Sequence, residues 1–317
     1  MTKVTADDLK IISKYISNIS GIELDDSKAY LIETRLGGLV KEYQCSSYGE
    51  LCSRARIDSS KTIENRIIDA ISTNETLFFR DARPFEVLQH KILPDLIDRR
   101  TEQSSGLFPI PIRIWSAACS TGQEVYSIAI VLRELLPDLT KYHIKLIGTD
   151  ISDAAIAQAS YGRYNKFEIE RGLSRNALQK YFVPNGGNWR ICDEIRAMVA
   201  FDKRNILQPF NGMERLDIIF CRNVAIYFKL EDRKSLFEKI AHVLAPDGYL
   251  IIGSTESLTG ISSIFESKRY LRTIYYQLKQ EKGAVRITAN QSSTQFGCKT
   301  RATREEVIHG PAKITYG

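Results

Sequence analysis

The sequence is poor in the residue patterns that hold metal ions or disulfide frameworks. It contains only 4 histidines, and its 6 cysteines are scattered without a C-x-x-C pair. Structural zinc sites and disulfide-rich domains usually show closely spaced cysteines. We therefore expect no metal site and no disulfide framework, and we interpret the cysteines as buried, reduced thiols. They are Cys45, Cys52, Cys119, Cys192, Cys221 and Cys298.

Long apolar stretches are also absent. No run reaches the roughly 18–20 apolar residues that are needed to span a membrane. The polar start MTKVTADDLK lacks the apolar centre of a signal peptide. We therefore expect a cytoplasmic protein without membrane insertion.

The net charge of +6 raises the question of a polyanionic partner such as nucleic acid. Much of this charge lies near the C-terminal end, because seven basic and three acidic residues occur from Lys279 onward. The rest of the chain is nearly neutral. This distribution argues against nucleic acid as a partner.

Apolar residues recur at helical spacing in three places within about the first 80 residues. This pattern predicts a small helical domain over residues 1–80. The three sets are Leu9, Ile12, Ile16 and Ile19, then Leu36, Leu39, Val40 and Tyr43, and then Ile63, Ile67, Ala70 and Ile71.

Over residues 81–280, short apolar runs alternate with helical patterns. The runs are IRIW (112–115), IKLIGTD (144–150), LDIIFC (216–221) and YLIIG (249–253). Such runs are typical of a parallel sheet that is covered on both faces, so we predict a doubly wound α/β domain.

A polar segment at about 163–203 interrupts this alternation. It contains a PNGGN turn and a WRIC…MVAF pair that looks like a hairpin, which predicts a small inserted β-subdomain. Residues 281–317 are rich in Ser, Thr, Gln and Gly, and we interpret them as a linker or a disordered tail.

The loop after the first predicted strand is suited to a close approach of a ligand. Its sequence, SAACSTGQE (116–124), is made of small residues and leads into a predicted helix with free N–H groups. The G-x-G-x-x-G fingerprint of dinucleotide sites is absent, which argues against NAD or FAD. Ligands of doubly wound sheets bind at the carboxyl ends of the strands, so we expect this loop to line a site.

Two acidic residues stand near that edge of the predicted sheet. Asp150 ends the second strand, where a carboxylate can accept hydrogen bonds from both ribose hydroxyls. The alternative is a turn or N-cap residue before Ser152, but the adjacent loop favours ribose binding. Glu124 is interpreted as the partner of a ligand ammonium group, with a favourable interaction with the helix dipole as the alternative.

TNETLFFRD (73–81) sets polar side chains among apolar ones. Asn74 and Thr76 are either helix caps or site residues, and Arg80 is either a structural ion-pair partner or a site residue.

CRNVAIYF (221–228) follows the third predicted strand and carries Arg222, Asn223 and Tyr227. By spacing alone, a buried Tyr227 with a satisfied hydroxyl is favoured.

The motifs TNETLFFRD, SAACSTGQEVYSIAI, GTDIS, RGLS…YF, FCRNVAIYF and GSTESL occur in this order. Together they resemble the CheR family of chemotaxis-receptor glutamate methyltransferases, over roughly residues 5–280. The resemblance implies a class I S-adenosylmethionine-dependent methyltransferase fold, which is a Rossmann-like doubly wound sheet. It also implies an N-terminal helical domain and a small inserted β-subdomain.

The resemblance further implies a set of site residues. Arg80 and Tyr227 would lie beside the methyl group as the catalytic residues. Gln123 departs from the family motif, in which Glu is common, whereas the neighbouring Glu124 is retained. The residues expected at the cofactor are Asn74, Thr76, Arg80, Ala118, Glu124, Asp150, Asn205, Ile206, Arg222 and Asn223.

The implied reaction methylates glutamate side chains in the cytoplasmic region of methyl-accepting chemotaxis receptors and leaves S-adenosylhomocysteine. A glutamate carboxylate has a pKa of about 4.3, so it is ionised at neutral pH and needs no general base. This agrees with the absence of a Ser-His-Asp, Cys-His or paired-carboxylate pattern. We assign Arg80 to holding charge near the site and Tyr227 to orienting the acceptor oxygen.

Two other functions stay open. A methyltransferase of the same fold could act on RNA or a small molecule, although the nearly neutral body argues against RNA. A non-catalytic, cofactor-binding adaptor could dock on receptors, although the intact cofactor motifs argue against it.

Two regions are expected to concern the receptor. Basic residues outnumber acidic ones over residues 28–56, and the resemblance favours receptor docking there over a merely solvated helix face. Some family members capture a C-terminal receptor pentapeptide on the inserted subdomain. The compact PNGGN turn (184–188) leaves little chain for a peptide groove, so we expect no such tether. The expected docking residues are Lys28, Arg35, Lys41, Arg54 and Arg56.

Overall fold

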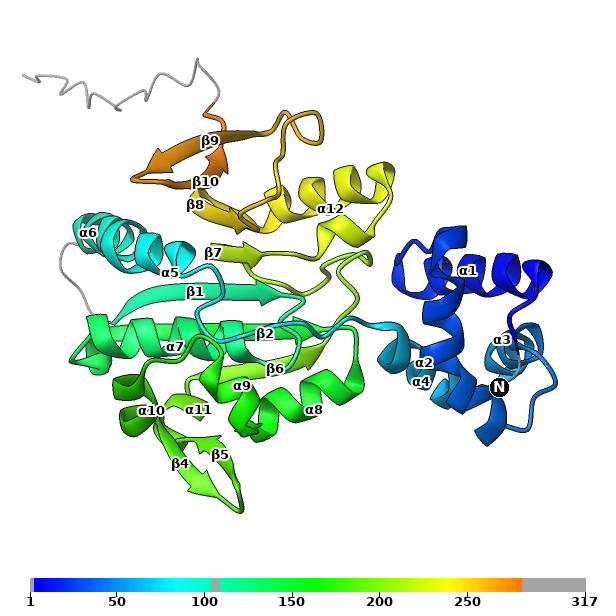
Figure 1. The fold of residues 1–317 in the computed structure, drawn as a ribbon. Coiled ribbons are helices and arrows are strands. Elements are labelled where there is room, and N and C mark those ends of the chain that lie inside the picture. The colour runs from blue at the N-terminus through cyan, green and yellow to red at the C-terminus, as the bar shows by residue number, and fades with distance from the viewer. Residues whose placement is uncertain (1–2, 104–108, 281–317) are drawn as a thin grey trace, which may run out of the picture. The chain divides into compact units, whose positions relative to one another are not determined.

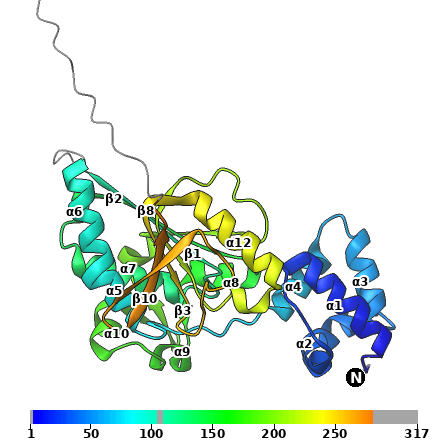
Figure 2. The ribbon, with the colours of Figure 1, turned by 90° about the horizontal axis from the view of Figure 1, so that it is seen from above.

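Helices form the N-terminal region of the chain in a computed structural model that describes residues 3–103 and 109–280. These helices lie together (Figures 1 and 2), and they bury a shared apolar core that includes Ile12 and Leu36. The three predicted helical patterns lie in α1, α2 and α4 and are confirmed. The pattern misses α3, because its buried face contains the small residues Cys52 and Ala55. The elements are α1 (Ala6–Ser20), the 3-10 turn Asp26–Lys28, α2 (Ala29–Glu42), α3 (Tyr48–Ile57) and α4 (Thr62–Ile71).

In the described residues, the larger sheet has seven strands in the order β6-β2-β1-β7-β8-β10-β9 (Figure 1). The first five strands of this order are parallel, whereas β10 is antiparallel to both β8 and β9. The four predicted apolar runs lie in β1, β2, β7 and β8 and are confirmed. The strands are β1 (Ile110–Ala117), β2 (Tyr142–Asp150), β6 (Val199–Lys203), β7 (Leu216–Cys221), β8 (Leu244–Ile252), β9 (Phe265–Tyr270) and β10 (Thr273–Leu278).

Apolar cores cover both faces of this sheet. Ile114 and Phe220 belong to a core that also contains residues of α5, α6 and α7. Trp115 and Ile219, their neighbours along β1 and β7, belong to a second core that contains residues of α12. Burial on both faces explains the continuous apolar runs of these strands. The helices and turns are α5 (Arg83–Val87), the π-helical turn Leu88–Ile92, α6 (Leu93–Gln103), α7 (Gln123–Leu135), the 3-10 turn Leu139–Lys141, α8 (Asp153–Tyr161), the 3-10 turn Ala225–Tyr227 and α12 (Leu230–Val243).

A smaller antiparallel sheet, with the order β3-β5-β4, is inserted in the chain between β2 and β6. Its β4–β5 turn has Gly186 and Gly187 at positive φ (54° and 79°), as expected of a compact two-residue turn. The predicted pairing of WRIC with MVAF is wrong, because MVAF enters β6 and pairs in parallel with β2. The inserted sheet therefore ends at Ile191 and not near residue 203. The elements are β3 (Arg163–Tyr164), α9 (Lys166–Glu170), α10 (Arg175–Tyr181), β4 (Phe182–Asn185), β5 (Asn188–Ile191) and α11 (Asp193–Arg196).

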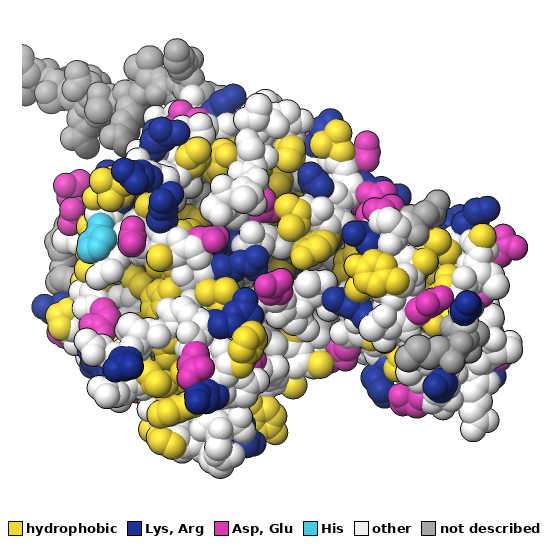
Figure 3. All heavy atoms as spheres, in the orientation of Figure 1, with side chains coloured by type: hydrophobic (Ala, Val, Ile, Leu, Met, Phe, Trp, Pro, Cys, Tyr) yellow, Lys and Arg dark blue, Asp and Glu magenta, His cyan; other side chains and the backbone are white. Residues whose placement is uncertain are grey.

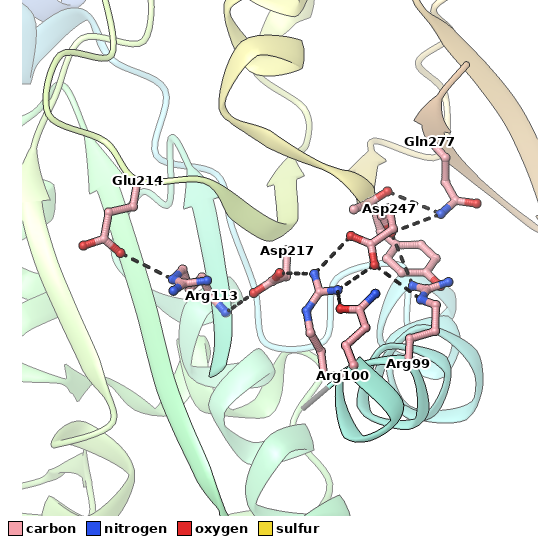
Figure 4. Close-up of polar contacts among 10 residues, drawn as sticks. Arg99, Arg100, Arg113, Glu214, Asp217, Asp247 and Gln277 are labelled. Atoms are coloured by element: carbon pink, nitrogen blue, oxygen red, sulfur yellow. Dashed lines mark hydrogen bonds and ion pairs between the residues drawn. The ribbon is translucent and has the colours of Figure 1, made fainter. Parts of the chain in front are cut away.

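An ion-pair network joins α6 to the amino-terminal halves of the strands (Figure 4). Arg100 donates to Asp217 in β7 (2.7 Å) and to both carboxylate oxygens of Asp247 in β8 (2.7 and 3.0 Å). Asp217 is buried and also accepts the backbone N–H of Arg113 in β1 (2.8 Å). One guanidinium thus fastens a helix to neighbouring strands, at the end of the sheet away from their carboxyl ends.

Candidate active site

A cavity lies at the carboxyl ends of β1, β2 and β7. Its volume is about 890 Å³, including space that is open to solvent. Every residue that the family resemblance assigns to the cofactor or the methyl group lines this cavity, while the role of each stays a prediction. The residues are Asn74, Thr76, Arg80, Ala118, Glu124, Asp150, Asn205, Ile206, Arg222, Asn223 and Tyr227.

The loop between β1 and α7 turns tightly around one wall of the cavity. Ala118 and Ser120 have positive φ values of 58° and 52°, and Gly122 has a φ of 95°. A Cβ on Gly122 would lie 2.9 Å from the Cβ of Ala159, so a side chain does not fit there. Cys119 donates its backbone N–H to a carbonyl of β2 (2.8 Å). The small residues of this loop therefore bring its backbone to the edge of the cavity.

Asp150, the last residue of β2, is a buried carboxylate. Its oxygens accept the backbone N–H groups of Ser120 (2.8 Å) and Ser152 (3.0 Å). Ser152, and not Asp150, is the N-cap of α8. Burial raises the pKa of Asp150, although the backbone hydrogen bonds act in the opposite direction. A carboxylate can accept about four hydrogen bonds, so these two leave capacity for ribose hydroxyls.

Glu124 and Asp81 hold the guanidinium of Arg222 from two sides. Arg222 donates to Glu124 (2.8 Å) and to Asp81 (2.7 Å), and its side chain is only 1% exposed. The other oxygen of Glu124 accepts the hydroxyl of Ser116 (2.8 Å). Glu124 therefore does more than place a charge at the start of α7, and a ligand ammonium group would share this carboxylate with Arg222.

Arg80 lines the cavity from the segment after α4, and the backbone next to it is strained. Phe79, Asp81 and Ala82 have φ values of 50°, 67° and 41°, which residues other than glycine rarely adopt. Arg80 donates one N–H to the carbonyl of Glu75 (2.8 Å). Its remaining N–H groups have no hydrogen-bond partner among the described residues, so they are available to a ligand.

Tyr227 stands at the rim of the cavity, in the 3-10 turn after β7. It is 37% exposed, so the interpretation as a buried tyrosine is wrong. Its carbonyl accepts the backbone N–H of Glu23 (2.9 Å), which fixes the turn to the helical region. Its hydroxyl has no partner within the described part of the chain. The hydroxyl can therefore meet a group that arrives from solvent.

Two carboxylates that were not expected from the motifs support the site. Asp81 binds Arg222, and Glu256 accepts the backbone N–H groups of Asn223 and Gly253 (2.7 Å each). Both lie inside quoted motifs, and this is the only signal in the sequence; Glu256 follows β8, whereas Asp81 lies between α4 and α5. The helical region also contributes lining residues that were not assigned to the site from the sequence. They are Ser20, Ile22, Ser72 and Thr73.

The five expected docking residues differ in what they contact. Arg35 donates to the two carbonyls at the carboxyl end of α4 (2.7 and 3.0 Å). Arg54 pairs with a glutamate one turn earlier in α3 (2.6 Å), and Arg56 lies over a tyrosine ring of α1 (5.2 Å). The side chains of Lys28 and Lys41 make no hydrogen bond or ion pair to the residues that the structure describes. Docking by this group stays a prediction.

Charges of both signs are interspersed on the face drawn in Figure 3. No helix within residues 3–103 and 109–280 combines the length and the apolar character that crossing a membrane requires. Cys52, Cys119 and Cys221 are buried, and Cys45 and Cys192 are half-buried; these five are free thiols. Cys298 and the expected tail, residues 281–317, lie outside the described residues.

Comparison with known proteins identifies the family. The sequence model described as "CheR methyltransferase, SAM binding domain" matches residues 74–273, and "CheR methyltransferase, all-alpha domain" matches residues 7–72. The chain belongs to the CheR methyltransferase family. The chemotaxis protein methyltransferase Cher2 of Pseudomonas putida is 37% identical over 270 residues, which cover 84% of this chain and 95% of that protein. A chemotaxis protein methyltransferase of Vibrio parahaemolyticus is 36% identical over 289 residues, which cover 88% of this chain and 100% of that protein.

The family predicted from the motifs is thereby confirmed, together with the class I methyltransferase fold. As a CheR methyltransferase, the chain has a domain that binds S-adenosylmethionine. The cavity suits this cofactor chemically. Asp150 and Glu124 offer carboxylates for hydroxyl and ammonium groups, and Ala118, Cys119 and Ser120 of the loop after β1 line the cavity between them.

Proposed function

We propose that this CheR methyltransferase methylates glutamate side chains of methyl-accepting chemotaxis receptors in the cytoplasm. The products are a glutamate methyl ester and S-adenosylhomocysteine, and no metal takes part. The observation that carries the proposal is the cavity at the strand ends, which combines the buried Asp150 and the half-buried Glu124 on its wall with the exposed Tyr227 at its rim.

The cofactor would lie along the loops that end β1, β2 and β7. Asp150 would accept hydrogen bonds from the ribose, and Glu124 from the ammonium group. When bound, S-adenosylmethionine supplies an electrophilic methyl group on a positively charged sulfur. The group formed by Glu124, Arg222 and Asp81 contains two carboxylates and one guanidinium, so its net negative charge favours a cation nearby. The remaining residues proposed for the cofactor site are Asn74, Thr76, Arg80, Ala118, Asn205, Ile206 and Asn223.

The acceptor would be a receptor carboxylate that is already ionised, so the chain has to orient it rather than deprotonate it. The free N–H groups of Arg80 would attract this carboxylate, and the hydroxyl of Tyr227 would donate to one of its oxygens. No general base is needed because the acceptor is already deprotonated, and orientation of aligned reactants can lower a barrier by up to roughly 7–11 kcal/mol.

A transfer assay tests the proposal. The full chain, methyl-labelled S-adenosylmethionine and receptor-containing membranes should give labelled receptor, and mild base should release the label as methanol because a carboxyl methyl ester is hydrolysed under these conditions. Receptors whose glutamates are replaced by alanine serve as the control. A base-stable label would indicate another substrate, whereas cofactor binding without any transfer would indicate a non-catalytic adaptor.

A further inference from the structure

Lys239 in α12 places its ammonium group against the loop that follows β6. It donates to the carbonyls of Ile206 (3.1 Å), Leu207 and Gln208 (3.3 Å), and it lies 5.3 Å from the centre of the Phe210 ring. In residues 3–103 and 109–280 no carboxylate forms an ion pair with it. Three carbonyl dipoles and an aromatic face therefore take the place of a counter-ion.

The loop is folded so that its carbonyls are free to meet this ammonium group. The side-chain oxygen of Asn205 accepts the N–H of Leu207 (2.9 Å), and the carbonyl of Asn205 accepts the N–H of Gln208 (3.0 Å). The N–H groups of the turn are thus satisfied by Asn205, and the following carbonyls by Lys239. Without the ammonium group, these carbonyls would lose a charged donor in a partly buried place.

The same loop forms part of the cavity wall. Arg204, Asn205 and Ile206 line the cavity, whereas Lys239 does not. Arg204 donates its N–H to the carbonyl of Asp150 (2.8 Å), and the side chain of Asn205 donates to a carbonyl of α1 (3.1 Å). Lys239 therefore supports the part of the cavity wall next to Asp150, and it does so without lining the cavity itself.

We propose that Lys239 is a positioning residue for the cofactor, because it fixes Asn205 and Ile206 through the carbonyls of residues 206–208 without touching the ligand. The inference rests on the proposed use of this cavity as the cofactor site. Since the loop adjoins Asp150, which is assigned to the ribose, the effect falls on the nucleoside half of the cofactor.

Lys239→Met tests this role, because it keeps the apolar stem and removes the ammonium group. Calorimetry well below the melting temperature would measure the Kd of S-adenosylhomocysteine and of 5′-methylthioadenosine, which has the nucleoside and the thioether but no amino-acid end. We expect both Kd values to rise by the same factor, roughly tenfold. Lys239→Arg, which keeps charged donors, should recover part of the affinity. Lys234→Met, at an exposed position of the same helix, should match the parental protein.

A rise of less than about threefold for S-adenosylhomocysteine would overturn the inference. So would a loss confined to S-adenosylhomocysteine, since the defect would then lie at the amino-acid end. A lower melting temperature with parental Kd values would leave Lys239 as a purely structural residue. A different result would refute the proposed receptor reaction: a parental protein that binds S-adenosylhomocysteine but methylates no receptor. That result would leave the role of Lys239 intact.

Discussion

Asp150 has two backbone N–H groups to satisfy as well as a ligand to bind, so the choice of substitution matters. Asp150→Asn removes the negative charge and keeps one acceptor oxygen, which can still accept one of these two N–H groups. We expect it to weaken S-adenosylhomocysteine binding by about 1.5–3 kcal/mol, the worth of a charge-assisted hydrogen bond. Calorimetry measures the affinity, and circular dichroism checks that the fold survives. The control is Asp138→Asn, because Asp138 precedes the 3-10 turn that leads into the amino-terminal end of β2. A parental affinity for Asp150→Asn would show that Asp150 is a turn residue only.

Tyr227 offers a hydroxyl that has no partner in the described residues, so its removal should cost the folded protein little. We expect Tyr227→Phe to lower turnover by roughly tenfold or more, the effect of one lost hydrogen bond to a charged acceptor, with unchanged cofactor affinity and melting temperature. The measurement is kcat with both substrates saturating. Tyr161→Phe is the matched control, because Tyr161 is 76% exposed and does not line the cavity. A parental kcat would remove Tyr227 from the catalytic proposal.

Most of the residues assigned to the cavity were predictable from the sequence, because they occupy motifs at strand ends or the TNETLFFRD segment after α4. Residues that support the lining residues were not predictable in this way. Lys239 looks like any lysine of an amphipathic helix, since its partners are backbone carbonyls that converge only after folding. Asp81 and Glu256 lie inside motifs, but their bonds to Arg222 and to the backbone of Asn223 depend on how separate loops meet.

At the scale of elements, α3 carries two of the expected docking residues. Arg54→Glu with Arg56→Glu should raise the KM for receptor without changing cofactor affinity, because an opposite charge weakens attraction to an acidic surface. Arg54→Glu also places a like charge near Glu50 and removes the hydrogen bond from Arg54 to the carbonyl of Tyr43 (2.8 Å), so circular dichroism checks that α3 is retained. Lys10→Glu with Lys14→Glu on α1 makes the same change in net charge at exposed positions and serves as the control. Equal KM values for the two double variants would identify Arg54 and Arg56 as ordinary surface charge.

The Arg100 network gives a prediction for pH. Partial burial opposes the charged form of Asp247, but its hydrogen bonds and ion pair to Arg100 outweigh this and hold its pKa below the usual value. A carboxylate with a depressed pKa stabilises the fold above its unfolded pKa of about 3.9, and this contribution disappears as the pH falls through the lower folded value. Asp247→Asn should therefore be less stable than the parental protein by about 1–3 kcal/mol at neutral pH. Urea unfolding between neutral pH and pH 3 should show the difference shrinking below about pH 5; a constant gap would show that the ionised form of Asp247 contributes nothing.

Three of the strands have partners that the residue pattern does not predict. MVAF has the length and composition of a hairpin strand, and nothing local distinguishes it from β6, which joins a parallel sheet through contacts with β2. Likewise, β9 and β10 extend the sheet antiparallel to β8, although the apolar runs favoured a parallel sheet. Partner strands are chosen by tertiary packing, which a period of two residues does not encode.

At the scale of the whole molecule, the doubly wound fold was predictable because buried parallel strands require continuous apolar runs. The contribution of the residues that end α1 and α4 to the cavity was not. Ser20 and Thr73 line the cavity beside residues of the sheet region, and Ser152 at the start of α8 donates its hydroxyl to Asp69 of α4 (2.7 Å). Polar contacts of this kind join segments more than eighty residues apart in the chain and leave no periodic signal.

A peptide tether between enzyme and receptor would raise the local concentration of the enzyme without a new catalytic contact. Such a tether would add a strand to an edge of the small sheet. One edge, β3, has only two residues, and the other, β4, contains Pro184, which has no N–H to donate. The two-residue turn at Gly186 and Gly187 adds no wall for a groove. We therefore expect calorimetry with C-terminal receptor pentapeptides to show no binding at micromolar concentrations. Receptors with and without their last five residues should accordingly be methylated at equal rates. A micromolar Kd, together with slower methylation of the truncated receptor, would refute this expectation while leaving the proposed methyl transfer in place.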